Sequence, residues 1–166
     1  THVAAPLRGT ADRWGRTLAI GVPGLVLSLL VALGTLGYTD RWDATAVVLG
    51  ATLGTLLASL GLASVVSAMV VFPVTAPGEN PFAAQQGGSM AAVISQTVGS
   101  VALLVVLAPT YVVGVLAVVK TSAVLAAVAA VLGVVTGVAV LLGGITAGSR
   151  RLEASAPELL ARLRSF

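Results

Sequence analysis

Four polar side chains lie within two helical turns of an otherwise apolar stretch: Ser95, Gln96, Thr97 and Ser100. Their hydroxyl and amide groups form hydrogen bonds, and at membrane depth they would line a cavity through which a substrate passes. The alternative is that they form hydrogen bonds between neighbouring helices, each worth about 1 kcal/mol. The residues themselves leave both readings open.

A second polar group precedes the first long apolar tract. It consists of Arg8, Asp12, Arg13 and Arg16. Arginines beside a membrane segment anchor it at anionic lipid and set its orientation. Pro6 and Gly9 make this approach irregular, and we expect residues 1–16 to lie along the membrane surface on the cytoplasmic side.

Several classes of chemistry are excluded by residue type. The chain has no cysteine, which excludes a thiolate nucleophile. Its single histidine, His2, lies at the start of the sequence, so we expect neither a histidine-centred triad nor a multi-histidine metal site. No Gly-Lys-Ser/Thr loop occurs for binding ATP phosphates. We therefore expect no enzyme activity and no bound cofactor or metal in this chain. The formal charge of +3 comes from basic residues that flank apolar segments, which does not indicate nucleic-acid binding.

The elements that must position these residues are long and uncharged. Hydrophobic residues make up 57% of the 166 residues and charged ones only 9%, against about 25% charged in soluble domains. Tracts without any Asp, Glu, Lys or Arg are Thr17–Thr39, Ala44–Gly78, Asn80–Val119 and Thr121–Ser149. Each exceeds the roughly 20 residues that a helix needs to cross a bilayer. The sequence predicts an all-α integral membrane protein with four transmembrane helices.

Within residues 17–148 the predicted crossings are Leu18–Leu36, Thr45–Phe72, Met90–Ala108 and Ser122–Thr146. Pro109 interrupts the chain after the third. The short stretch Tyr111–Val119 then either extends a kinked third helix or forms a separate re-entrant or outer-leaflet helix before the last span. Two motifs, Gly50-x-x-x-Gly54 and Gly133-x-x-x-Gly137, predict close helix packing, either within the chain or in a homodimer.

Residues 73–89 break the apolar pattern and are predicted to be an exposed cytoplasmic loop. Its candidate functional residues are Pro77, Gly78, Glu79, Asn80, Pro81 and Phe82. Residues 149–166, with four arginines, form a predicted amphipathic tail. An even number of crossings places both ends on one side, and basic flanks favour the cytoplasm, leaving Arg41 and Lys120 outside.

Four segments of the chain resemble a known family. They are Val3–Arg16, Leu60–Ala68 leading to Phe72–Phe82, the Pro109-interrupted stretch, and Arg151–Leu160. Together they resemble the last third of actinobacterial ABC-2-type exporter permeases of the tetronasin and multidrug type. The Pro-Val…Pro-Gly…Asn-Pro-Phe pattern between Phe72 and Phe82 is the most specific part. The order of crossings is that of helices three to six in one half of such a permease.

The resemblance implies the membrane part of an exporter of hydrophobic compounds in a bacterial plasma membrane. ATP and Mg²⁺ would be bound by a partner ATPase, expected as a dimer, and the Pro6–Arg16 segment would contact it through Arg8, Asp12, Arg13 and Arg16. The remaining permease helices would come from the same or another chain, because the resemblance covers only part of a permease. One alternative is a non-catalytic assembly subunit of a larger membrane complex, and a weaker one is a small homo-oligomeric pore or carrier.

Overall fold

The computed structural model describes residues 9–69 and 86–163, with side chains described for residues 14–67, 90 and 93–149. This part of the chain is entirely helical. The helices are α1 (Gly9–Thr39), a short 3₁₀ turn η1 (Trp42–Ala44), α2 (Thr45–Met69), α3 (Gln86–Val119) and α4 (Ala123–Leu163). In a hydrocarbon solvent every backbone N–H and C=O must be bonded internally, which drives even valine-rich sequences into helices.

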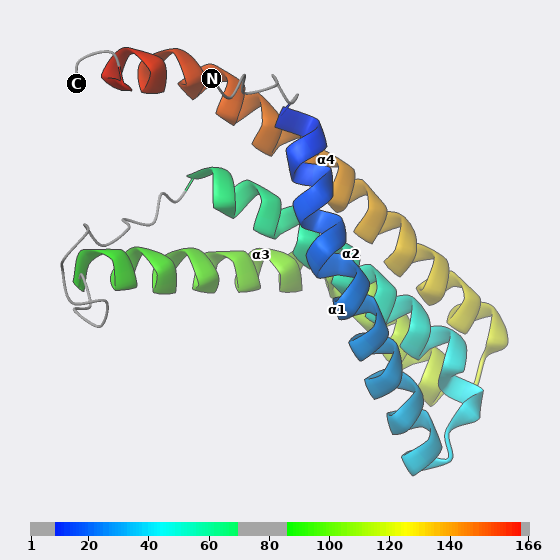
Figure 1. Cartoon of the computed structure of the whole chain (residues 1–166). Coiled ribbons are helices and arrows are strands. Elements are labelled where there is room, and N and C mark those ends of the chain that lie inside the picture. Colours follow the sequence, from blue (N-terminus) through cyan, green and yellow to red (C-terminus); the bar gives the residue numbers. More distant parts are fainter. Residues whose placement is uncertain (1–8, 70–85, 164–166) are drawn as a thin grey trace.

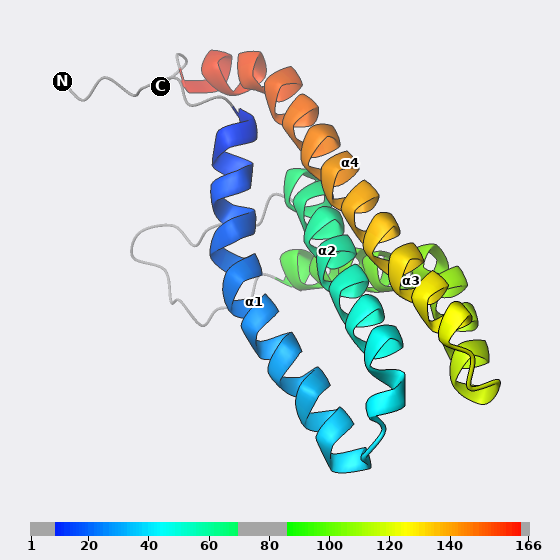
Figure 2. The same ribbon diagram turned by 90° about the vertical axis from the view of Figure 1, so that its right-hand side faces the viewer.

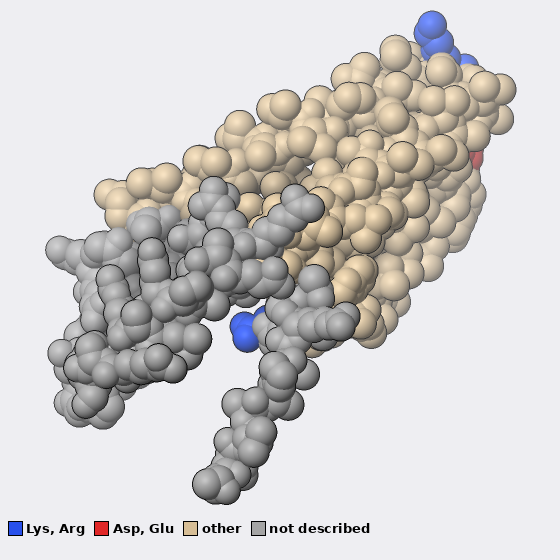
Figure 3. All heavy atoms as spheres, turned by 90° about the horizontal axis from the view of Figure 1, so that it is seen from above, with Lys and Arg blue, Asp and Glu red and all other residues tan. Residues whose placement is uncertain are grey.

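Four of these helices are long and apolar enough to cross a membrane. The candidate spans are Trp14–Thr39, Trp42–Ser67, Val93–Val119 and Ala123–Ser149. They agree with the four predicted crossings, and the all-helical membrane fold is confirmed. The described surface in Figure 3 is correspondingly almost free of charged atoms, which occur only at its margins.

Consecutive spans run in opposite directions (Figures 1 and 2). The turn between α1 and α2 and the turn between α3 and α4 lie at one end. The start of α1 and the C-terminal part of α4 lie together at the other end. Beyond its span, α4 continues as helix to Leu163, and this last part turns away from the direction of the span.

Helices α2 and α4 pack backbone to backbone along a seam of small residues. A Cβ atom added to Gly50 would lie 2.7 Å from the Cβ atom of Ala130, and one added to Gly137 would lie 2.7 Å from the carbonyl oxygen of Gly54. Further along, a Cβ atom on Gly144 would lie 2.6 Å from the carbonyl carbon of Gly61. Such distances are closer than any real side chain tolerates, so only glycine permits this approach.

The seam shows where the two Gly-x-x-x-Gly motifs act. Gly133 lies against Gly50 and Gly54, and Gly137 lies against Gly54, so the motif on α2 and the motif on α4 are partners. Gly50, Gly54 and Gly137 are also buried. In this structure the two packing faces are therefore used within one chain.

Both turns at the α1–α2 and α3–α4 end have the same construction. Each helix is followed by a residue with positive φ, Asp40 at 49° after α1 and Thr121 at 46° after α3. The next N–H then bonds back five residues, from Arg41 to the Leu36 carbonyl at 3.2 Å and from Ser122 to the Ala117 carbonyl at 3.1 Å. This arrangement is the Schellman motif, which satisfies carbonyls at a helix end.

The first of these turns also carries an exposed ion pair. Arg41 Nε donates to Asp43 Oδ1 and Arg41 Nη2 donates to Asp43 Oδ2, both at 3.0 Å. The hydrogen bond and the negative charge of Asp43 raise the pKa of the Arg41 guanidinium above its ordinary value. Arginine is charged at physiological pH in any case, and the ion pair with Asp43 favours that form, as suits a group at the water-facing edge of a span.

Helix α3 is a single helix that bends part-way along its length (Figure 1). Its C-terminal part packs against α2 and α4, with Leu107, Thr110, Gly114 and Ala117 buried on one face. Its N-terminal part, residues 93–106, runs away from that contact and has no buried residue. Pro109 lies inside the helix and cannot donate a hydrogen bond to the Val105 carbonyl, which accounts for a bend here.

This continuity decides between the two alternatives for the stretch after Pro109. Tyr111–Val119 is the C-terminal part of α3 and is not a separate re-entrant helix. The predicted end of the third crossing at Ala108 is therefore wrong, because proline was treated as a break where the helix continues through it. The helix also begins at Gln86, within the stretch that was predicted to be a loop.

Candidate functional site

A groove lined by hydroxyl groups opens between α1, α2 and α3, and we call it the hydroxyl groove. Its volume is about 400 Å³. The lining residues are Ser28, Ala51, Thr52, Thr55, Leu56, Ser59 and Tyr111. None of them is charged, and five carry a hydroxyl group.

The local fold explains why these hydroxyls face the same space. Thr52, Thr55 and Ser59 are spaced three and four residues apart on α2, which places them on one face of the helix. Ser28 comes from α1 and Tyr111 from the C-terminal part of α3. Ser28 and Thr55 each lie near the middle of a candidate span, so the groove is at membrane depth.

One hydrogen bond crosses the groove from α3 to α2. The hydroxyl oxygens of Tyr111 and Thr55 are 2.7 Å apart. Thr55 Oγ1 also donates to the Ala51 carbonyl at 2.7 Å, which uses its only proton. Tyr111 is therefore the donor in the bond between them, and its own oxygen lone pairs remain available to the groove.

The serine protons are used in the same way. Ser28 Oγ donates to the Leu25 carbonyl at 3.1 Å, and Ser59 Oγ donates to the Leu56 carbonyl at 2.8 Å. Both bonds stay within one helix turn, as is common for serine in membrane helices. The protons of the two serines are thus directed at the backbone, while their oxygens keep acceptor capacity.

A second groove adjoins the hydroxyl groove at Tyr111, and we call it the valine groove. Its volume is about 250 Å³, and it shares Ala51 and Tyr111 with the groove. The remaining lining residues are Val47, Thr110, Gly114, Val115, Val118 and Val119. Thr110 is 2% exposed, and its Oγ1 has no hydrogen-bond partner within the described part of the chain.

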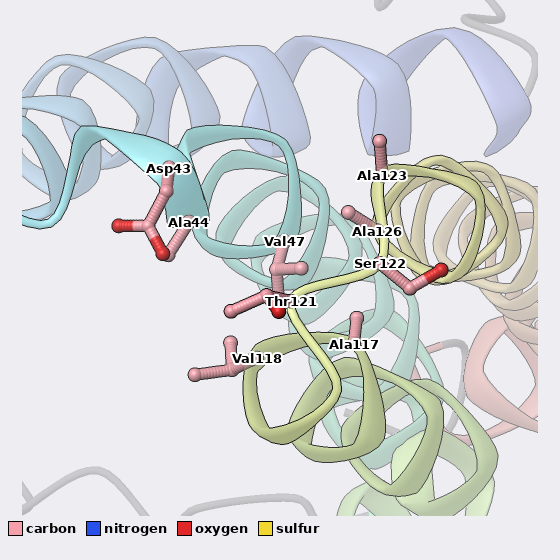
Figure 4. Close-up of a pocket in the computed structure, with 9 residues that line it drawn as sticks. All are labelled: Asp43, Ala44, Val47, Ala117, Val118, Thr121, Ser122, Ala123 and Ala126. Carbon is pink, nitrogen blue, oxygen red and sulfur yellow. The ribbon is translucent and has the colours of Figure 1, made fainter.

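A third cavity lies between the two turns, and Figure 4 shows its lining. Its volume is about 200 Å³, and it shares Val47 and Val118 with the valine groove. Asp43 from η1 and Ser122 from the turn before α4 are among its polar residues. Through these shared residues the three cavities follow one another along α2, from the turns to mid-membrane depth.

The polar residues singled out from the sequence lie elsewhere. Ser95, Gln96, Thr97 and Ser100 are on the N-terminal part of α3, where Gln96, Thr97 and Ser100 are exposed and Thr97 Oγ1 donates to the Val93 carbonyl at 2.8 Å. They are separate from the three cavities described above. Their proposed role in lining a substrate path stays a prediction.

The predicted coupling residues are only partly described. Arg16 is exposed near the start of α1, and the backbone of Asp12 and Arg13 is helical, while Arg8 lies outside the described residues. The loop candidates Pro77, Gly78, Glu79, Asn80, Pro81 and Phe82 also lie outside them. Across the described residues no cluster of acidic or histidine side chains could hold a metal ion.

Sequence reasoning missed all five hydroxyl residues of the groove. The spacing of Thr52, Thr55 and Ser59 was a usable signal, because three hydroxyls on one face of an apolar helix are directed at a common neighbour. Tyr111 reaches the groove because the part of α3 after the bend packs against α2, and this packing is visible only in the tertiary structure. No protein-family model, curated protein or solved structure matches this chain. The structure itself shows a four-helix membrane protein.

Proposed function

We propose that this chain forms part of the membrane pathway of an ABC-2-type exporter, which moves hydrophobic compounds outward when a separate ATPase hydrolyses ATP. The observation that carries the proposal is the hydroxyl groove, which is open, uncharged and at membrane depth. An apolar solute with a few polar groups fits such a lining. The spans contain no mid-membrane acid or base, which argues against coupling to an ion gradient within this chain.

The resemblance of Val3–Arg16 and Phe72–Phe82 to exporter permeases supports the same proposal from the sequence. Under it, ATP and Mg²⁺ belong to the partner ATPase, and Arg8, Asp12, Arg13 and Arg16 contact that partner from the cytoplasmic side. The remaining helices of the permease complete the pathway around the groove.

The first experiment identifies the companions of the protein. We would extract it from its own membrane in a mild detergent and determine by mass spectrometry its intact length and its stoichiometric partners. An ABC ATPase at a fixed ratio is the expected result. Stoichiometric partners without any ATPase would overturn the exporter proposal in favour of an assembly subunit.

A second experiment tests the groove. Thr52→Phe fills the hydroxyl groove with an aromatic ring, whereas Thr35→Phe places the same ring at an exposed position of α1 outside the groove. We expect Thr52→Phe to abolish efflux of a neutral fluorescent dye while the ATPase still co-purifies, and Thr35→Phe to leave efflux unchanged. Equal efflux in the two variants would remove the groove from the pathway.

The coupling residues have their own test. Alanine substitution of Arg13 and Arg16 should reduce substrate-stimulated ATP hydrolysis without preventing membrane insertion. If these arginines only anchor the helix at lipid, stimulated hydrolysis will stay at the unsubstituted level.

A further inference from the structure

The hydroxyl groove offers more free hydrogen-bond acceptors than free donors. Four of its five hydroxyl protons are already donated: Ser28 to Leu25, Thr55 to Ala51, Ser59 to Leu56, and Tyr111 to Thr55. At most one free proton, that of Thr52, remains for a ligand. Each hydroxyl oxygen can accept two hydrogen bonds. The oxygens of Ser28, Ser59 and Tyr111 keep both lone pairs available, and Thr55 keeps one.

The groove also has no charged side chains, so its hydroxyl groups alone determine which polar ligands it can bind. The groove contains no carboxylate that could compensate a cation and no lysine or arginine that could compensate an anion. A charged ligand at this depth would lose its hydration without gaining a partner. A ligand that only accepts hydrogen bonds would find a single proton, that of Thr52, and would otherwise face oxygen lone pairs.

We infer that the hydroxyl groove selects uncharged, mainly apolar molecules that carry a hydrogen-bond donor, such as an alcohol, a phenol or an amide N–H. Tyr111 and Thr55 form the central acceptor pair. Compounds whose polar atoms are all ethers, esters or ketones bind less tightly. This inference rests on the proposed function, because it takes the groove as the substrate site and names the class of substrate.

The bond between Tyr111 and Thr55 gives the inference a distinctive test. Replacing Thr55 by valine keeps the shape of the side chain but removes the acceptor for the Tyr111 proton. That proton then becomes available to the groove. In Thr55→Val the groove should therefore bind acceptor-only ligands better than before, and its preference for donor ligands should decrease or reverse.

The experiment uses two probes of nearly equal shape. 2-Naphthol carries a donor, and 2-methoxynaphthalene carries only an acceptor oxygen. Binding of each would be measured by saturation-transfer NMR to the protein, extracted with its companions from its own membrane and placed in lipid nanodiscs. Empty nanodiscs give the correction for partition into lipid.

We expect 2-naphthol to bind more tightly than 2-methoxynaphthalene by about three- to tenfold, the value of one net hydrogen bond. In Thr55→Val the ratio should fall to one or below, and in the double variant Thr55→Val/Tyr111→Phe it should lie near one. Thr35→Val is the matched control, because Thr35 also donates to its own helix but lies outside the groove, and its ratio should equal that of the unsubstituted protein. Circular dichroism checks that each variant retains its helices.

Each other outcome has a distinct meaning. Equal binding of the two probes, or a ratio that Thr55→Val leaves unchanged, overturns the donor preference and leaves the exporter proposal standing. Absence of saturable binding by either probe overturns the groove as a binding site. The identity of the protein as an exporter component is decided separately, by the presence of the ATPase in the purified complex.

Discussion

Among the described residues, Asp40 and Thr121 adopt a positive φ without being glycine, and each lies just after the end of a helix. A left-handed conformation costs roughly 1–2 kcal/mol for a residue with a side chain. It is least suitable for a β-branched residue such as threonine. The strain is tolerated at Thr121 because the following N–H, from Ser122, then reaches the Ala117 carbonyl.

Replacing Thr121 by glycine should therefore stabilise the protein. The gain from relieved strain is partly offset by the greater freedom of glycine in the unfolded chain, which leaves about 1 kcal/mol in the free energy of unfolding. Thr97→Gly is the control, because Thr97 lies inside α3, where glycine is less favourable than threonine by roughly 0.3–0.5 kcal/mol. Unfolding in mixed micelles would measure both, and a lower stability of Thr121→Gly would contradict the strain argument.

At the same scale, the chemistry of single residues was the hardest part to predict. The exclusion of a thiolate nucleophile needs only the residue types, and no structure is required for it. The hydroxyl groove, in contrast, needs side chains from α1, α2 and α3 to meet, and their meeting depends on helix rotation and on the bend in α3. Gln96 stood out because it is the most polar residue at depth, yet it lies on the exposed side of α3.

At the scale of elements, the seam between α2 and α4 gives a sharp prediction from two adjacent residues. A Cβ atom on Gly144 meets the backbone of Gly61, whereas a Cβ atom on Gly143 meets nothing within 4 Å. We expect Gly144→Ala to lower the free energy of unfolding by about 2 kcal/mol or more, because the two backbones must separate. Gly143→Ala should leave it unchanged or slightly raised.

The two variants have the same amino-acid composition, so a difference in stability measured in the same detergent reflects only the position of the added methyl group. Similar stabilities would mean that α2 and α4 do not approach as closely as the structure has them. A loss in Gly143→Ala alone would place the seam on the wrong face of α4.

The bend of α3 provides a second prediction at this scale. Pro109→Ala restores the hydrogen bond to the Val105 carbonyl, and a straight α3 would continue alongside α2. Because the chain has no cysteine, spin labels attach only where cysteines are introduced. The distance between labels at Val98 and Ala63, both exposed, should shorten in Pro109→Ala.

A label pair at Val112 and Val131 is the control. Val112 lies after the bend in α3, and Val131 lies on α4, so the bend does not separate the two labels. Their separation should stay the same. An unchanged distance between Val98 and Ala63 would mean that packing, and not proline, sets the bend.

The existence of the four helices was predictable because length and absence of charge leave few alternatives in a bilayer. The end of the third crossing was not, since a proline in a membrane helix either terminates it or bends it, and neighbouring helices decide which. The pairing of the two glycine motifs also required the structure, because each motif alone specifies only a face. The seam joins Gly50 to Ala130 and Gly54 to Gly133, a register that no spacing within one helix encodes.

At the scale of the whole molecule, the orientation in the membrane is testable by labelling. Asp40 and Lys120 lie at the end with the two turns, and Gly15 and Ala154 lie towards the other end. With the expected orientation, cysteines at Asp40 and Lys120 react with an impermeant maleimide in intact cells. Cysteines at Gly15 and Ala154 should react only after permeabilisation, because cationic flanks remain in the cytoplasm.

If cysteines at Gly15 and Ala154 react in intact cells and those at Asp40 and Lys120 do not, the protein crosses the membrane four times in the opposite orientation. Labelling of Asp40 and Lys120 from opposite sides would contradict the arrangement in which both turns share one end.

The glycine seam also has a mechanical consequence. Along the seam, glycines of each helix meet backbone of the other, so sliding α2 past α4 by one residue would drive leucine side chains such as Leu57 or Leu141 into a space that admits no side chain. The seam therefore resists sliding of α2 past α4, and we expect a displacement of α4 along its axis to carry α2 with it.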